Sequence, residues 1–271
     1  MNQTCVFGRY DHLVGVKNIV ESAAPFAVIM MTPGMLHHVG PYRMHVEMAH
    51  CLEQQQISSF RFDLSGIGES LGVGISGRSI DRAAFEAQEA MDYLSDKHGI
   101  KQFILFGLCS GADDSVQTAL QDERVTGIIA MDGLAYSTPT FLQKEALFMA
   151  RKALIPEKVI NKIRTKLGNS GKPNSLTPGS DVREFPESAE QGAQELQTLV
   201  DNNVQLHFIY TGGTDYYNYA EQFYDMLPGM KWKGTESTHY FSQMDHLAML
   251  CEDRQLLVEH VTEKAVDMLA A

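Results

Sequence analysis

Basic residues are outnumbered in this chain: 22 lysine and arginine residues stand against 34 aspartate and glutamate residues, and the formal net charge is −12 at pH 7. A surface this acidic is repelled by phosphate backbones and by anionic lipid headgroups. We therefore expect no nucleic acid among its partners.

Cysteine is also scarce. The four residues Cys5, Cys51, Cys109 and Cys251 are widely spaced among 271 and form no Cys-x-x-Cys pair. This spacing favours neither a disulfide framework nor a zinc site. The ten histidines show no regular metal-ligand spacing either, so we expect no metal and no cofactor. A reducing compartment, the cytoplasm, fits this cysteine usage.

Long hydrophobic runs are absent as well. Phe26 to Met31 is among the longest, whereas about 20 apolar residues are needed to cross a bilayer. The N-terminus shows no basic segment followed by an apolar stretch, so we expect no export signal and no membrane insertion. The oligomeric state is left open by the sequence.

Short apolar runs alternate with helical patterns from residue 26 onward, which is typical of a parallel α/β sheet with helices on both faces. A β-hairpin of Thr4–Phe7 and Leu13–Val20 precedes this alternation. The expected strands are Phe26–Met31, Ile57–Phe62, Phe103–Phe106, Val125–Met131, Val204–Tyr210 and Met230–Thr235. A closing helix is expected at Leu247–Leu269.

The alternation is interrupted between residues 137 and 203. Two helical segments, Phe141–Ile155 and Glu157–Leu167, follow one another with no strand between them, and Gly168–Asp181 is rich in turn-forming residues. We predict a core of residues 1–136 and 204–271 with a helical cap of residues 137–203. Phe141 and Phe148 of the cap are candidate substrate contacts, although a helix packed on the core would look the same.

Gly107-Leu-Cys-Ser-Gly111 joins the strand at Phe103–Phe106 to a helix. It fits a nucleophile elbow, a turn so sharp that only small residues fit two positions either side of the nucleophile. Cys109 has glycine at both positions, whereas Ser110 would have Leu108 and Ala112. The pattern therefore favours Cys109 as the nucleophile, the alternative being an inert buried thiol.

Ligands collect at the carboxyl ends of parallel strands. After the strand at residues 26–31, Gly34 permits close approach of a substrate, and the Met35 amide is a candidate oxyanion donor beside the Ser110 amide. The plain alternative for Pro33-Gly34-Met35 is a simple turn.

A carboxylate and a histidine are expected at the same edge. Asp215 follows the strand at residues 204–210, and His246 lies just before the closing helix, which gives the chain order nucleophile, acid, histidine. Asp132, at the end of the preceding strand, is the competing acid, and His239 is the competing base.

With these motifs in order, the chain resembles the α/β-hydrolase superfamily over nearly its whole length. Arg61-Phe-Asp-Leu-Ser-Gly-Ile-Gly-Glu-Ser70 is similar to the loop after the fourth strand in this family, and His38-Val-Gly-Pro-Tyr-Arg43 to a serine-aminopeptidase-like bacterial subgroup. The resemblance implies a mostly parallel sheet of about eight strands with a small cap. Cys109 departs from the usual serine, as in dienelactone hydrolases and some thioesterases.

The resemblance implies an enzyme that forms an acyl thioester on Cys109, with Asp215 orienting His246. Two reactions follow for a small or carrier-linked acyl substrate. One is hydrolysis of an activated ester, thioester or lactone, and the other is acyl transfer to an amine or hydroxyl. The third alternative is a non-catalytic ligand-binding protein on the same fold.

Overall fold

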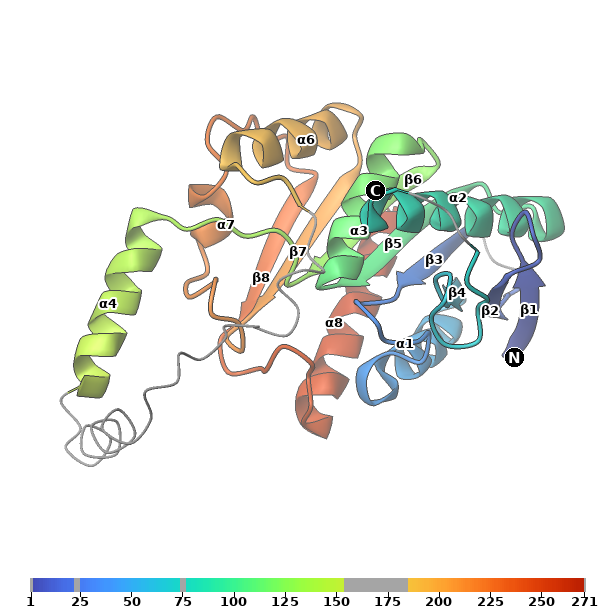
Figure 1. The fold of residues 1–271 in the computed structure, drawn as a ribbon, viewed down its shortest axis with the longest axis horizontal. Helices are drawn as coiled ribbons and strands as arrows, with labels where there is room; N and C mark the ends of the chain where they lie inside the picture. Colours follow the sequence, from blue (N-terminus) through green and yellow to red (C-terminus); the bar gives the residue numbers. More distant parts are fainter. Residues whose placement is uncertain (1, 22–24, 74–76, 154–184, 271) are drawn as a thin grey trace.

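One sheet organises the computed structural model, which describes residues 2–21, 25–73, 77–153 and 185–270 (Figure 1). Its strand order is β1-β2-β4-β3-β5-β6-β7-β8. Only β1, β2 and their neighbour β4 pair antiparallel; every other pairing is parallel. The predicted sheet is thus confirmed, with strands β1 (Gln3–Phe7), β2 (Leu13–Asn18), β3 (Phe26–Met31), β4 (Ser58–Phe62), β5 (Gln102–Leu108), β6 (Val125–Met131), β7 (Gln205–Thr211) and β8 (Glu236–Phe241).

Helices cover both faces of the sheet (Figure 1). Along β5, Phe103 and Leu105 pack into one apolar cluster, and Ile104 and Phe106 into the other, because successive side chains of a strand point to opposite faces. The first cluster is completed by α2 (Ser79–His98), α3 (Ser110–Gln121) and α6 (Ala189–Asp201), and the second by α1 (Met44–Gln54) and α8 (Cys251–Ala270). Burial on two sides explains why the central strands are continuously apolar.

The predicted insertion divides into two different parts. Helix α4 (Pro139–Ala153) projects away from the sheet (Figure 1). Helix α6, in contrast, buries Leu196 and Leu199 in the same cluster as α2 and α3. We therefore group α6 with the core, and the cap boundary at residue 203 stays a prediction. The predicted helix at Glu157–Leu167 and the loop at Gly168–Asp181 lie outside the described residues.

The last strand lies further along the chain than the apolar run suggests. We expect a strand at Met230–Thr235, but β8 begins at Glu236. Met230 and Trp232 instead pack against the core from the loop before it, after the short helix α7 (Gln222–Asp225). Within β8, the ring centroid of His239 lies 4.6 Å from that of His260 on α8. His239 therefore packs against α8.

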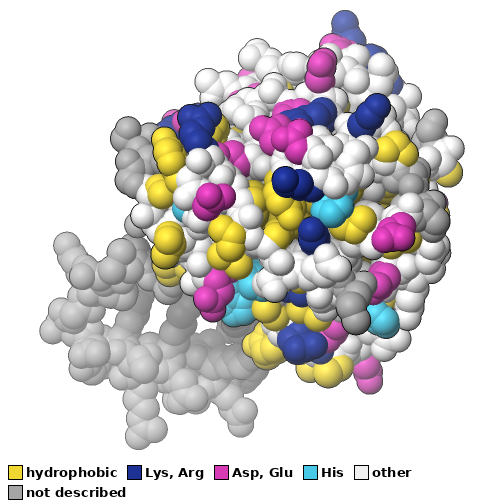
Figure 2. All heavy atoms as spheres, turned by 90° about the vertical axis from the view of Figure 1, so that its right-hand side faces the viewer, with side chains coloured by type: hydrophobic (Ala, Val, Ile, Leu, Met, Phe, Trp, Pro, Cys, Tyr) yellow, Lys and Arg dark blue, Asp and Glu magenta, His cyan; other side chains and the backbone are white. Residues whose placement is uncertain are grey.

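The surface is mixed in charge on the side of β1 and α2. Figure 2 shows basic side chains separated by acidic ones there, with no continuous positive surface on this face. Among the described helices, none combines the length and the hydropathy needed to cross a bilayer. The absence of nucleic-acid partners stays a prediction.

Candidate active site

Cys109 occupies the turn between β5 and α3. Its backbone conformation, φ 57° and ψ −121°, is one that residues other than glycine seldom adopt. The turn is fixed by hydrogen bonds at both sides: the Cys109 amide donates to the Met131 carbonyl at 2.9 Å, and the Ala112 amide donates to the Cys109 carbonyl at 3.0 Å. A residue held at positive φ costs energy, and such strain is common at active sites.

Glycine is required on both sides of Cys109, as the elbow motif predicts. A Cβ at Gly107 would lie 2.0 Å from the Gly111 carbonyl oxygen, and a Cβ at Gly111 would lie 2.9 Å from the Met31 carbonyl oxygen. The two glycines therefore let α3 begin directly against the ends of β3 and β5.

Substituting Gly107→Ala should cost at least about 3 kcal/mol of unfolding free energy, because backbone, not a flexible side chain, has to move. Gly72→Ala is the matched control, since neither position has positive φ and the nearest atom to a Cβ at Gly72 is 3.9 Å away. Urea unfolding of both variants checks the difference. Equal stabilities would show that the elbow tolerates a methyl group.

The neighbouring Ser110 is turned away from the site. It is only 6% exposed, and its Oγ accepts a hydrogen bond from the Gly34 amide at 2.6 Å. Cys109 keeps partial exposure. The serine hydroxyl thus ties the loop after β3 to the start of α3, and the cysteine thiol is the side chain left facing the site.

The structure places Asp132, not the preferred Asp215, against His246. Asp132 Oδ2 lies 2.8 Å from His246 Nδ1. The carboxylate is fully buried and also accepts hydrogen bonds from the Thr211 amide at 2.8 Å and the Thr211 hydroxyl at 2.7 Å. Three partners on a buried carboxylate fix its position.

Asp215 is exposed, in the loop after β7 whose Gly213 lies close to the His246 backbone. A Cβ at Gly213 would lie 2.4 Å from the His246 amide nitrogen, so the loop passes too close for a side chain to intervene. In this structure the carboxylate against His246 follows β6, whereas we expected one after β7.

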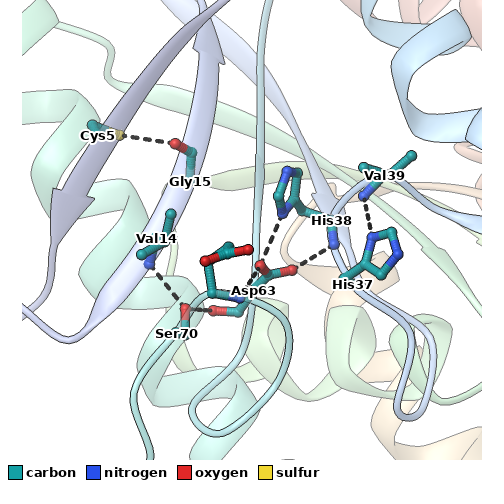
Figure 3. A network of polar contacts seen from close by, with 9 residues as sticks. Cys5, Val14, Gly15, His37, His38, Val39, Asp63 and Ser70 are labelled. Carbon is teal, nitrogen blue, oxygen red and sulfur yellow. Dashed lines mark hydrogen bonds and ion pairs between the residues drawn. The ribbon is translucent and has the colours of Figure 1, made fainter.

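The loop after β3 is held by a pair that the sequence reasoning missed (Figure 3). Asp63, fully buried after β4, accepts hydrogen bonds from the His38 amide at 2.5 Å and the Glu69 amide at 2.9 Å, and His38 Nδ1 lies 2.9 Å from the same carboxylate. Together with the Ser110 contact to Gly34, this pair anchors both ends of the segment that carries the Met35 amide. Both residues lie in the segments 38–43 and 61–70 that carry the family resemblance, but the sequence does not indicate that they contact one another.

A family comparison matches the part of the chain that carries the elbow and Asp132. The sequence profile of the family described as serine aminopeptidase, S33, matches residues 23–210, well over half of the chain. The chain belongs to this family of α/β-hydrolases. A search of curated proteins finds no match.

Solved structures share the fold of this S33 hydrolase at low sequence identity. One is the mouse alpha/beta hydrolase domain-containing protein 10, with 16% identity, TM-score 0.58 and 99% of both chains covered. Another is a Pyrococcus furiosus esterase, with 12% identity, TM-score 0.63 and coverage of 100% of this chain and 90% of that one. A third is a thermophilic esterase from Thermogutta terrifontis with malate bound, at 16% identity, TM-score 0.59 and coverage of 100% and 98%.

His246 of this S33 hydrolase has an altered acidity. Burial lowers its pKa, but hydrogen bonds to Asp132 and Cys109 together with their charges outweigh burial and raise the pKa to about 9. Because Nδ1 faces Asp132, Nε2 is the nitrogen left to exchange a proton with Cys109. A protonated ring in this position would stabilise a thiolate beside it.

Alkylation of Cys109 by iodoacetamide should therefore depend on His246 most strongly at low pH. At pH 6 to 7 the ring is charged and holds a thiolate, so wild type should react at least about tenfold faster than His246→Gln. The ratio should shrink as pH rises through 9, because the ring loses its proton and the thiol of the variant ionises unaided. Peptide mapping by mass spectrometry checks this. Exposed Cys251 is the internal control, and a ratio independent of pH would contradict the pairing.

The two aromatic residues expected at the substrate differ in exposure. Phe141 is 5% exposed, and its carbonyl accepts a hydrogen bond from the Asn218 side chain at 3.2 Å, which joins the start of α4 to the body of the protein. Phe148, further along α4, is 62% exposed. Substrate contacts by Gly34, Phe141 and Phe148 stay predictions.

No group of three or more histidine, cysteine, aspartate or glutamate side chains within the described part of the chain is placed to hold a metal ion.

Proposed function

We propose that Cys109, His246 and Asp132 form a catalytic triad that hydrolyses an activated ester, thioester or lactone through an acyl thioester. The observation that carries the proposal is the position of His246, which contacts the buried Asp132 carboxylate through Nδ1 and the Cys109 thiol of the elbow. Nucleophile, base and orienting carboxylate in contact are the signature of covalent catalysis.

In the first half-reaction the Cys109 thiolate attacks the acyl carbonyl, a C–S bond forms, and the carbonyl oxygen takes up the negative charge. The amides of Ser110 and Met35 are the candidate donors to this oxyanion. As the C–O or C–S bond to the leaving group breaks, protonated His246 gives it a proton from Nε2. The thioester and neutral His246 remain.

In the second half-reaction neutral His246 takes a proton from water as the water attacks the thioester. Collapse of the intermediate releases the carboxylic acid and restores the Cys109 thiolate beside the imidazolium. Asp132 keeps its contact with His246 Nδ1 and stabilises the charged ring. A thiol nucleophile has to remain reduced, which fits a reducing compartment such as the cytoplasm.

Intact-mass spectrometry after mixing the protein with a panel of acyl thioesters and aryl esters tests the proposal. A mass increase of one acyl group, located on Cys109 by peptide mapping, is the expected result, and its decay in water is expected to release the free acid. Decay only after addition of an amine would identify an acyltransferase instead. An adduct located on Ser110, or none with any donor, would contradict the cysteine assignment.

A further inference from the structure

Arg61 is a buried arginine without a counterion of its own. It lies near the end of β4, is 5% exposed, and its neighbours Phe60 and Phe62 point into the cluster on the α2 side, so Arg61 points to the α1 side. Its Nε has no hydrogen-bond partner, and no ion pair to its guanidinium is formed within the described residues. A guanidinium buried in this way normally has a carboxylate or phosphate against it.

Two charged groups act on Arg61 in opposite directions, and the negative one is shared with the loop after β3. Burial lowers the pKa of Arg61, and the nearby charge of Arg43 lowers it further. Asp63 acts in the opposite direction, but this carboxylate already accepts from the His38 amide and the Glu69 amide, and His38 Nδ1 lies against it. Fully buried His45 has a pKa lowered to about 4 by burial, so it is neutral and supplies no negative charge.

Arg43 makes this positive region accessible from solvent. It is exposed and stands directly before the first residue of α1, where the amides of the helix end add a partial positive charge. Buried Arg61 and exposed Arg43 thus present two guanidinium groups, each able to bind an oxyanion through two N–H donors.

We propose that Arg61 and Arg43 form a binding site for an oxyanion, a carboxylate or phosphate group, next to the loop that carries Gly34 and Met35. The site is physically joined to the candidate active site, because Asp63, two residues after Arg61, holds His38 of that loop (Figure 3), and Gly34 of the same loop bonds to Ser110. Strand β4 is two strands from β5, about 10 Å. One molecule can therefore place its anionic group at Arg61 and its carbonyl at Cys109.

Thermal unfolding in phosphate or succinate, at constant ionic strength set by chloride, tests binding without relying on catalysis. Either anion should raise the melting temperature of wild type. Arg61→Met should weaken this response at least tenfold, Arg43→Gln should weaken it severalfold, and Arg78→Gln should leave it unchanged. Arg78 is the matched control because it is exposed and pairs with Asp81 at 2.8 Å.

Without added anion, Arg61→Met should melt at a higher temperature than wild type, because it removes a buried charge that lacks a partner. A lower melting temperature or failure to fold would show that Arg61 is satisfied by the protein itself and would overturn the proposal. Equal responses of wild type, Arg61→Met and Arg43→Gln to phosphate and succinate would overturn it as well.

A second measurement separates a substrate anion from a free ion, and it rests on the proposed function of Cys109. Turnover of 4-nitrophenyl acetate is compared with turnover of mono-4-nitrophenyl succinate, which carries a carboxylate. If the site binds the substrate, phosphate competes only with the succinate ester, and Arg61→Met raises only the KM of that ester. Phosphate binding without such competition identifies a free ion as the ligand. If neither ester reacts, that result counts against the proposed function alone, and the binding measurement still decides the site.

Discussion

Replacing Cys109 with alanine should lower kcat/KM for an activated thioester or aryl ester by roughly 10⁴-fold or more and abolish the acyl adduct. The thiolate is the atom that forms the covalent bond, and no other side chain at the elbow can take its place, since the Ser110 hydroxyl is engaged by the Gly34 amide at 2.6 Å. Steady-state kinetics and intact mass on the same samples measure both effects.

Ser110→Ala is the control for this experiment. It removes the hydroxyl that accepts from Gly34 and keeps the amide that is the candidate oxyanion donor, so we expect a loss of about tenfold or less. Cys109→Ser keeps the geometry of the elbow and replaces thiol by hydroxyl, and it should retain a small part of the activity. A Cys109→Ala variant that still forms the adduct, with a Ser110→Ala variant that does not, would reverse the two roles.

The elbow could be read from sequence because its constraint is local. Whether a side chain fits two residues from Cys109 depends on atoms of the same turn, and Gly107 in fact has the carbonyl of Gly111 where a Cβ would be. The alternation of apolar strands and helices is equally local, and the α/β-hydrolase sheet follows from it.

The carboxylate could not be chosen in this way because it depends on two neighbouring strand ends. Asp132 and Asp215 both follow apolar strands, and β6 and β7 are adjacent in the sheet. The structure places Asp132 Oδ2 2.8 Å from His246 Nδ1 and leaves Asp215 exposed, and this contact joins residues 114 positions apart in the chain. The strand expected at Met230–Thr235 was wrong because its apolar residues belong to a loop. Met230 and Trp232 pack on the core from this loop, and the side chains of such a loop are as apolar as those of a strand.

The contact that anchors the loop after β3 was not predicted. His38 and Asp63 each lie in a segment that resembles the family, but they are 25 positions apart, and neither segment indicates that the two residues pair. Buried polar pairs of this kind fix loops through long-range contacts, which periodicity along the sequence does not report.

Asp132→Asn should lower kcat for thioester or ester hydrolysis by about 10²- to 10⁴-fold with a much smaller effect on KM. The amide keeps the volume of the side chain and can still bond to Thr211, but it loses the negative charge against His246 Nδ1, so the charged ring required for leaving-group protonation is no longer stabilised. The apparent pKa of His246, about 9 in the native protein, should fall accordingly, and the pH dependence of kcat should shift to lower pH.

Asp215→Asn supplies the matched comparison because it makes the same chemical change on an exposed carboxylate one strand away. We expect kcat within about twofold of wild type, as for most surface substitutions. If Asp215→Asn instead caused the large loss and Asp132→Asn the small one, the working conformation would have to bring the loop after β7 around so that Asp215 reaches His246. The kinetic comparison thus tests the geometry of the candidate triad and the rigidity of the loops that hold it.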